Sequence, residues 1–267
     1  MPLREVADGV LVATSAVYST SSVVLVGHGG HCLLVDPGVT AGEIAALADD
    51  VRTRGLTPVA VWSTHHHWDH LLDGPALSHL PRWGVPVRPG RLPGLRNLLG
   101  ELEASDELAE ALAHRPGDVA ATIASAPVGF PVEVGPGPGQ VLAWDGPTVV
   151  VLTHHAHAPA HTALHLPSAG VLVAGDMLSD VEIPLLDLEG DDPLGDYRAG
   201  LALLAGTGAR VVVPGHGHAG TDLAARVARD EAYLDSLTAA PDDPRLSVPW
   251  LREADAQQRA LTPPAPA

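Results

Sequence analysis

The sequence has no lysine, a single cysteine and a single phenylalanine, and aromatic residues make up 3% of its 267 positions. One cysteine excludes a disulfide within the chain, and Cys32, inside the apolar segment 31–35, is typical of a buried thiol. Because aromatic side chains are so scarce, the core must be built mainly from valine, leucine, alanine and isoleucine.

Positive charge is also scarce, since 15 arginines face 32 acidic residues and leave a formal net charge of −17. Nucleic acids and anionic membranes are bound through basic surfaces, so this balance argues against both as partners. Polyanionic substrates are disfavoured for the same reason. We therefore expect a small-molecule substrate that does not carry many negative charges.

Long hydrophobic runs are absent as well. No stretch of eighteen apolar residues occurs, and residues 1–6 carry no apolar signal segment. A hydrophobic fraction of 46% and a mean hydropathy of +0.15 nevertheless indicate a folded chain with a core. Together these features predict a cytoplasmic protein.

Short apolar runs alternate with turns and helical patterns along the chain. Strands are predicted over 10–12, 22–26, 32–35, 58–62, 148–152, 162–166, 171–174 and 210–213. Apolar residues at helical spacing predict helices over 42–54, 95–115, 194–205, 222–237 and 249–260. Because the composition shows no break strong enough for a domain boundary, we expect one domain over 1–267. It would carry an insertion at about 71–145 and a frayed, proline-rich tail from about 262.

The segment 65–70, His-His-His-Trp-Asp-His, carries four imidazoles and a carboxylate shortly after the predicted strand 58–62. Alternate residues of a strand point to the same side, so His65 and His67 can face one point as the strand runs into a loop. Asp69 and His70 follow where the chain turns, and can face a second point. The segment can therefore supply ligands to two metal ions, with a solvated polar loop as the alternative.

Polar residues follow three strands of the second half in the same way. The histidine-rich stretch 153–161 follows the strand 148–152, Asp176 follows 171–174, and His216 follows 210–213. Each of these residues alone would be interpreted as an ordinary loop or turn residue. Their joint occurrence at strand ends predicts one shared site, because rigid elements can hold such loops in place.

The order of these motifs resembles that of the metallo-β-lactamase-fold metallohydrolases, over most of the chain from about 6 to 237. The family pattern H-x-H-x-D-H is matched at 65–70, and the His-Ala-Pro-Ala-His loop at 157–161 resembles H-T-P-G-H. The Gly-Asp at 175–176 and the Pro-Gly-His-Gly at 214–217 resemble the remaining two motifs. The resemblance implies an α+β fold, a four-layer αβ/βα sandwich with two metal ions at one edge.

The resemblance also implies seven metal ligands, namely His65, His67 and His157 for a first ion, Asp69, His70 and His216 for a second, and Asp176 as the bridge. Asp69 and Asp176 would be the catalytic carboxylates, because they partly neutralise the ion pair and leave a bridging hydroxide nucleophilic. Zinc is the default ion for histidine and aspartate ligands, and manganese or iron would fit as well. His161 and His218, beside ligands, are interpreted as supporting or solvated residues.

Departures from individual members of the family narrow the expected activity. At the position of Asp176, β-lactamases have either a Cys ligand or no such carboxylate. Asp176 therefore argues against antibiotic hydrolysis. His67 stands where flavodiiron proteins have a Glu, and the acidic composition argues against a nuclease. Glyoxalase II-like thioesterases share the ligands but add a helical C-terminal domain with basic residues. Acyl-homoserine lactonases carry a Tyr shortly after the bridging Asp, where this chain has Met-Leu-Ser-Asp at 177–180.

The resulting hypothesis is a dinuclear metal-dependent hydrolase of a small ester, lactone or thioester. The alternative is an oxidoreductase similar to persulfide dioxygenases, which share the fold but hold a single iron with the equivalents of His65, His157 and Asp176. A degenerate family member that binds a ligand without catalysis is the third interpretation, and the intact ligand set argues against it.

Overall fold

The computed structural model describes the chain except for residues 1, 73, 86–138, 140, 240–242 and 262–267. The helix predicted over 95–115, most of the insertion predicted at 71–145 and the tail from 262 lie outside the described residues. The prediction of a single domain over 1–267 therefore stays a prediction.

The N-terminal half forms a six-stranded sheet in the order β1-β2-β3-β4-β5-β6. Its strands are β1 (Arg4–Ala7), β2 (Val10–Thr14), β3 (Ser21–Val26), β4 (His31–Val35), β5 (Thr57–Trp62) and β6 (Arg82–Trp83). The first four strands are antiparallel neighbours, whereas β4, β5 and β6 run parallel. Besides helix α1 (Ala41–Thr53), the described residues of this half include two 3₁₀ helices (His28–Gly30 and Trp68–His70) and the short helix α2 (Gly74–Leu77).

Helix α1 (Ala41–Thr53) is the crossover that makes β4 and β5 parallel. It begins where the Thr40 hydroxyl accepts a hydrogen bond from the backbone N–H of Glu43. It ends just before Gly55, whose φ of 74° is the left-handed conformation that glycine adopts without strain. Sequence and structure agree here, because both end signals are local.

The C-terminal half forms a four-stranded sheet in the order β10-β9-β8-β7. Its elements are β7 (Val150–His154), β8 (His161–Leu166), β9 (Val171–Gly175), α6 (Pro193–Ala205), β10 (Val211–Pro214), α7 (Leu223–Ser236), a 3₁₀ helix (Pro244–Ser247) and α8 (Pro249–Leu261). The strands β7, β8 and β9 are antiparallel, and α6 is the crossover that makes β9 and β10 parallel. This arrangement repeats the strand, helix and parallel strand of the first half.

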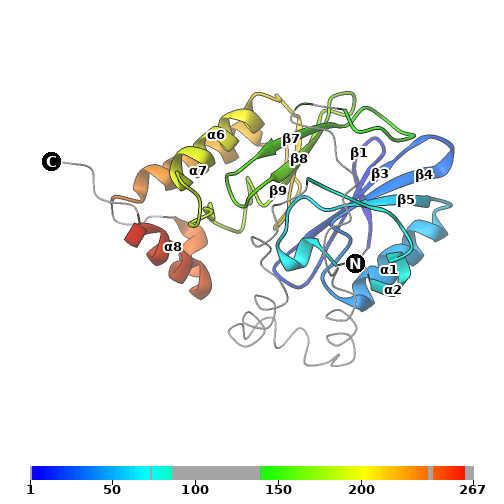
Figure 1. The fold of residues 1–267 in the computed structure, drawn as a ribbon, viewed down its shortest axis with the longest axis horizontal. Coiled ribbons are helices and arrows are strands. Elements are labelled where there is room, and N and C mark those ends of the chain that lie inside the picture. Colours follow the sequence, from blue (N-terminus) through cyan, green and yellow to red (C-terminus); the bar gives the residue numbers. More distant parts are fainter. Residues whose placement is uncertain (1, 73, 86–138, 140, 240–242, 262–267) are drawn as a thin grey trace.

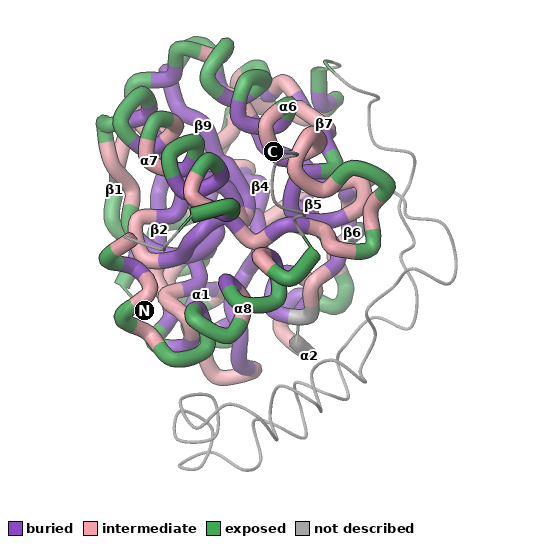
Figure 2. The backbone as a smooth tube through the Cα atoms, turned by 90° about the vertical axis from the view of Figure 1, so that its left-hand side faces the viewer, coloured by how far each residue is buried: buried purple, intermediate pink, exposed green. Residues whose placement is uncertain are grey.

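The two sheets pack face to face with helices outside each, so the molecule has four layers (Figure 1). Side-chain alternation along β4 shows how the layers are separated. Leu33 and Val35 lie in the core between the sheets, together with Trp62 and residues of β7 to β10. Cys32 and Leu34 point the other way and pack against α1. In Figure 2 the strands are largely purple, because both faces of each sheet are covered.

This architecture confirms the predicted α+β four-layer sandwich. Two local differences have physical reasons. The strand β1 escaped prediction because it is a polar edge strand whose Arg4 and Glu5 are exposed. The strand predicted over 148–152 lies two residues later, because its pairing with β8 runs from Val150 opposite His165 to His154 opposite His161.

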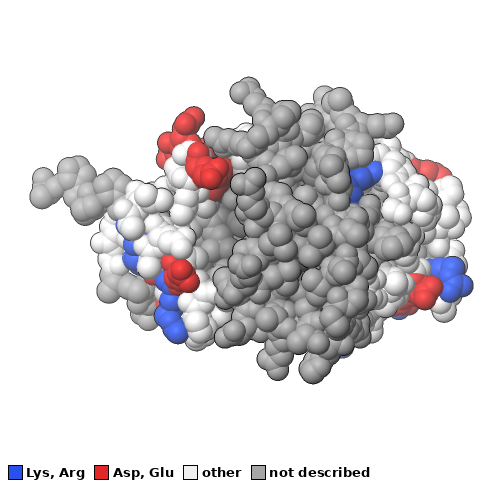
Figure 3. All heavy atoms as spheres, turned by 60° about the horizontal axis from the view of Figure 1, so that its bottom comes forward, with Lys and Arg blue, Asp and Glu red and all other residues white. Residues whose placement is uncertain are grey.

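Two features of the described residues, their helices and their basic side chains, concern the predicted absence of membrane and nucleic-acid partners. None of the helices in the described part of the chain combines the length and apolar character that a membrane crossing needs. On the face drawn in Figure 3, the blue basic side chains of the described residues lie in separate groups, some of them beside red acidic ones. Which partners the protein has stays a prediction.

The two sheets are joined by a polar contact at their shared edge. The indole N–H of Trp62, at the end of β5, donates to the hydroxyl of Thr162 on β8 over 3.1 Å. That hydroxyl and the backbone N–H of Thr162 both donate to the carbonyl of Thr64, each over 2.8 Å. Trp62 is fully buried, so its N–H has no access to water as an alternative partner.

We expect Trp62→Phe to lower the free energy of unfolding by about 2 kcal/mol, because it removes a buried hydrogen bond and leaves a cavity. The matched control is Trp250→Phe on α8, a residue that is 36% exposed and whose ring contacts Tyr18 edge to face. Phenylalanine keeps an aromatic ring there, so the free energy should change by less than about 1 kcal/mol. Denaturant unfolding followed by circular dichroism measures both values. Equal effects would contradict the role given to the Trp62 contact.

Candidate metal centre

All seven predicted ligands lie together at the edge where β5, β7, β9 and β10 end. They form two clusters, the first with His65, His67, His157 and Asp176, the second with Asp69, His70 and His216. Within each cluster one candidate ligand atom per residue lies within 4.8 Å of all the others. The structure thus brings together every residue that the sequence analysis selected for the site.

His65 and His67 face one point, as the sequence predicts, but for a different reason. We expected strand alternation to place His65 and His67 on one side, but β5 ends at Trp62. The loop that follows, not the strand, directs both imidazoles to one point. Asp69 and His70 then belong to the 3₁₀ helix Trp68–His70, whose tight turn directs them to the second cluster.

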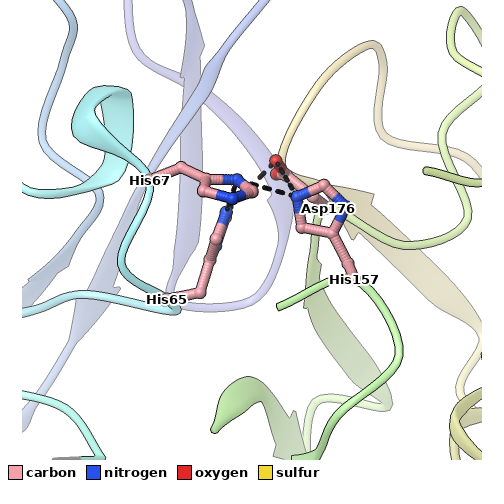
Figure 4. Close-up of side chains that lie close together, drawn as sticks. All are labelled: His65, His67, His157 and Asp176. Carbon is pink, nitrogen blue, oxygen red and sulfur yellow. Dashed lines mark hydrogen bonds and ion pairs between the residues drawn. The ribbon is translucent and has the colours of Figure 1, made fainter. Parts of the chain in front are cut away.

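The first cluster is drawn in Figure 4, where its three imidazoles and the Asp176 carboxylate point toward one another. His65 and His157 present Nε2, whereas His67 presents Nδ1, which lies 3.0 Å from the His65 nitrogen and 2.9 Å from that of His157. A single proton between two of these nitrogens can satisfy only that pair. Three nitrogens converging on one point are instead the arrangement that a metal ion requires.

The second cluster lies directly beside the first. Nε2 of His216 is 3.2 Å from the Asp69 carboxylate and 3.3 Å from Nε2 of His70. Nε2 of His70 is in turn 3.4 Å from Asp69. A carboxylate and two imidazoles again converge.

Asp176 contacts both clusters with its two carboxylate oxygens. Oδ2 lies 3.3 Å from Nε2 of His65 in the first cluster and 3.2 Å from Nε2 of His216 in the second. Oδ1 lies 3.2 Å from Nε2 of His70. Asp176 therefore lies between the two clusters and contacts both.

Glycines precede two of these ligands for a steric reason. A side chain at Gly215 would collide with the Asp176 carboxylate, and one at Gly175 would collide with the His161 ring. Gly175 also has a φ of 56°, which disfavours other residues. The Gly-Asp and Gly-His pairs of the sequence thus reflect how closely β9 approaches β8 and β10 at the site.

The ring nitrogens that face away from the clusters have hydrogen-bond acceptors. Nδ1 of His157 lies 2.8 Å from the carbonyl of Leu185, and Nδ1 of His216 lies 2.9 Å from the carbonyl of Tyr18. A carbonyl can only accept, so Nδ1 carries a proton in both rings, and the neutral form of each ring has its Nε2 lone pair directed at the site. This is the tautomer that a metal ligand needs.

Asp36 is a site residue that the sequence analysis missed. Its carboxylate lies 2.8 Å from Nδ1 of His70 and accepts hydrogen bonds from the backbone N–H and the hydroxyl of Thr64, over 3.0 and 2.7 Å. It follows β4 as the ligands follow their strands, and that position was the available signal. Because Pro37 and Gly38 follow it, however, the sequence alone makes it typical of a turn that ends a strand.

Burial and charge act differently on the buried imidazoles. Burial lowers the pKa of His65 well below its usual value and that of His67 to about 3. Burial acts in the same direction on His70, but the carboxylates of Asp176, Asp69 and Asp36 outweigh it and raise the pKa of His70 well above its usual value. The carboxylates therefore favour positive charge in this buried site, as a cation site should.

The neighbouring histidines have supporting or peripheral positions. His161 is buried, and its Nε2 accepts a hydrogen bond from the backbone N–H of Asp176 over 3.0 Å. His218 is exposed and pairs with Asp180 over 2.9 Å. His66 is buried with Nε2 3.1 Å from the carbonyl of Val85, and it belongs to neither cluster.

We expect Asp36→Asn to lower the free energy of unfolding by about 1–3 kcal/mol, because one amide cannot accept all three hydrogen bonds. The affinity for Zn²⁺ should fall roughly 10- to 100-fold, because His70 loses the acceptor that orients it. Chemical unfolding and chelator competition measure the two effects. Asp145→Asn, which removes an exposed carboxylate between His28 and His31, should leave both unchanged; an equal effect there would contradict the assignment.

Three comparisons with known proteins agree with this geometry. The family model described as the Metallo-beta-lactamase superfamily matches residues 17–216. A metallo-beta-lactamase family protein from Thermus thermophilus, TTHA1429, superposes with a TM-score of 0.67 at 26% identity, over 95% of this chain and 92% of that one. TTHA1623, solved in a di-iron-bound form, superposes with a TM-score of 0.57 at 28% identity, over 81% of this chain and 97% of that one.

Among curated proteins, a probable metallo-hydrolase of Bacillus subtilis (strain 168), YqgX, is 37% identical over 57 residues, which is 21% of this chain. The match spans a quarter (25%) of that relative's length. The family match is far longer, since it begins before β3 and ends at His216, the last predicted ligand. On this evidence the chain belongs to the metallo-beta-lactamase superfamily.

Proposed function

We propose that this protein is a dinuclear metal-dependent hydrolase of a small ester, lactone or thioester. The observation that carries the proposal is the position of Asp176, whose two oxygens contact imidazoles of both clusters. A carboxylate in that position suits two ions a few ångströms apart. The substrate class rests on the family resemblance and on the net charge of −17, which disfavours polyanions.

The donor set fits two transition-metal ions. Imidazole and carboxylate ligands suit zinc, and zinc is our first expectation. Manganese and iron take the same ligands, and the di-iron form of TTHA1623 supports iron as an alternative. The raised pKa of His70 and the lowered pKa of Asp176 fit as well, since both reflect a buried site in which the carboxylates are charged.

Two divalent ions bound there would lower the pKa of a water molecule between them and polarise the carbonyl group of a substrate. The residues of the chain would do the rest. Asp69 and Asp176 would partly neutralise the ions, so that the nucleophile is not held too tightly. The imidazoles of His70, His157 and His216 would keep Nε2 directed at the ions, because Nδ1 of each ring is hydrogen-bonded on the opposite side.

The second candidate is the persulfide dioxygenase-like oxidoreductase with one iron. It would need His65, His157 and Asp176 but has no use for a second cluster. The convergence of Asp69, His70 and His216 within 4.8 Å therefore favours the dinuclear hydrolase. One iron per chain together with oxygen uptake in the presence of a persulfide would favour the oxidoreductase instead.

We expect the purified protein to contain close to two transition-metal ions per chain. His65→Ala and Asp69→Ala should each lower the hydrolysis of simple esters, lactones or thioesters by more than about 100-fold, since even residues behind a ligand contribute 10- to 100-fold. Metal analysis by mass spectrometry and a hydrolysis assay measure both.

The matched control is His79→Ala, which removes an exposed histidine and should leave metal content and activity unchanged. Unchanged hydrolysis in His65→Ala or Asp69→Ala would show that the proposed mechanism is wrong. An intact protein without bound metal would revive the interpretation as a ligand-binding member of the family.

A further inference from the structure

The peptide bond between Leu185 and Leu186 connects the first cluster to the C-terminal helix. Its carbonyl oxygen lies 2.8 Å from Nδ1 of His157. The N–H of the same peptide unit donates to Oε1 of Gln258 over 2.7 Å. Because a peptide unit is planar and its N–H and C=O point in opposite directions, a contact on one side sets the direction of the other.

Gln258 of α8 is a buried residue whose side chain hydrogen-bonds this peptide and the one before it. Its side chain is 2% exposed, and its Nε2 donates to the carbonyl of Pro184 over 3.0 Å. The same Nε2 also lies 2.7 Å from the hydroxyl of Tyr233 on α7, and that hydroxyl donates to Asp255 of α8 over 2.9 Å. Gln258 therefore holds the backbone on both sides of Leu185, and α7 and α8 hold Gln258.

We propose that Gln258 is a positioning residue for His157, acting through the Leu185–Leu186 peptide. This inference rests on the proposed metal site. An acceptor on the N–H of a peptide polarises the unit and makes its carbonyl a better acceptor. A stronger acceptor at Nδ1 fixes the ring of His157 and makes Nε2 a better metal ligand.

Gln258 lies far from His157 in the sequence and outside the segment that matches the family. Gln258 lies 101 residues after His157 by the numbering and beyond the family match, which ends at residue 216. Helix α8, which lies outside the family match, thus contacts His157, a ligand within that match, through the Leu185–Leu186 peptide. A purely structural role is the competing explanation, because Gln258 also ties α8 to the rest of the protein.

The test compares Zn²⁺ affinities of the full-length protein, measured by competition with a chromophoric chelator. Gln258→Met keeps the length of the side chain but removes both hydrogen-bonding groups. We expect one of the two Zn²⁺ ions to bind on the order of 10- to 100-fold more weakly, with the other unchanged. Gln258→Glu, which keeps an acceptor for the N–H of Leu186, should restore most of the affinity.

Tyr233→Phe is the matched control. It removes a buried hydrogen bond of the same network but leaves both contacts between Gln258 and the backbone at Leu185. It should lower thermal stability while leaving both Zn²⁺ affinities unchanged. An equal loss of affinity in Tyr233→Phe, or wild-type affinities in Gln258→Met, would overturn the proposal.

If Gln258→Met does not fold, a change of the backbone tests the same contact. Replacing Leu186 with its α-hydroxy acid removes the N–H that Gln258 accepts from and turns the Leu185 carbonyl into a weaker ester acceptor. The affinity for one Zn²⁺ should again fall, and an unchanged affinity would overturn the proposal. A wild-type protein that binds none of Zn²⁺, Mn²⁺ and Fe²⁺ would overturn the proposed function itself, and this inference with it.

Discussion

The contact on which the rest of the site depends is the Asp176 carboxylate, buried between imidazoles of both clusters. Its oxygens lie 3.2–3.4 Å from Nε2 of four histidines, namely His65, His70, His157 and His216. A buried carboxylate is costly unless positive charge or hydrogen-bond donors surround it. The histidines around Asp176 meet that requirement only if protons or metal ions supply the positive charge. The ligands of both clusters are therefore linked through one side chain.

The fold brings these ligands together because both halves place a parallel strand pair at the same edge. The crossover helices α1 and α6 return the chain to that edge, where β5 and β10 each end next to the site. The hydrogen bond from Trp62 to Thr162 joins the sheets close to the first cluster. Strand ends are rigid, so ligands that follow them within three residues, such as His157 after β7 and His216 after β10, are held in place.

Residue types and strand ends in the sequence predict one shared site, and the family resemblance then implies the seven ligands and the four-layer fold. Each described helix of ten or more residues also lies within about two residues of its prediction. The support of the ligands could not be predicted in the same way. Asp36 contacts His70 across 34 positions, and Gln258 contacts Leu186 across 72, so no local pattern connects them. Their residue types are uninformative too, since aspartate after a strand is typical of turns and glutamine in a helix is typical of a solvated face.

The hydrogen bonds that other residues make to the ligands also matter for the stability of the protein. The two clusters hold seven ionisable side chains where a core of the same size would have apolar ones. Without cations, one proton can join only one pair of the converging ring nitrogens, such as His67 Nδ1 and His157 Nε2 at 2.9 Å. A third nitrogen, such as Nε2 of His65 at 3.0 Å from His67 Nδ1, is then left with a lone pair that the others repel. Supporting contacts from Asp36, Leu185 and Tyr18 keep the rings in place against that repulsion. Metal binding would then add stability in proportion to the logarithm of the free ion concentration, because only the folded chain offers the complete site. The same contacts that orient the ligands for chemistry would therefore also couple metal binding to folding.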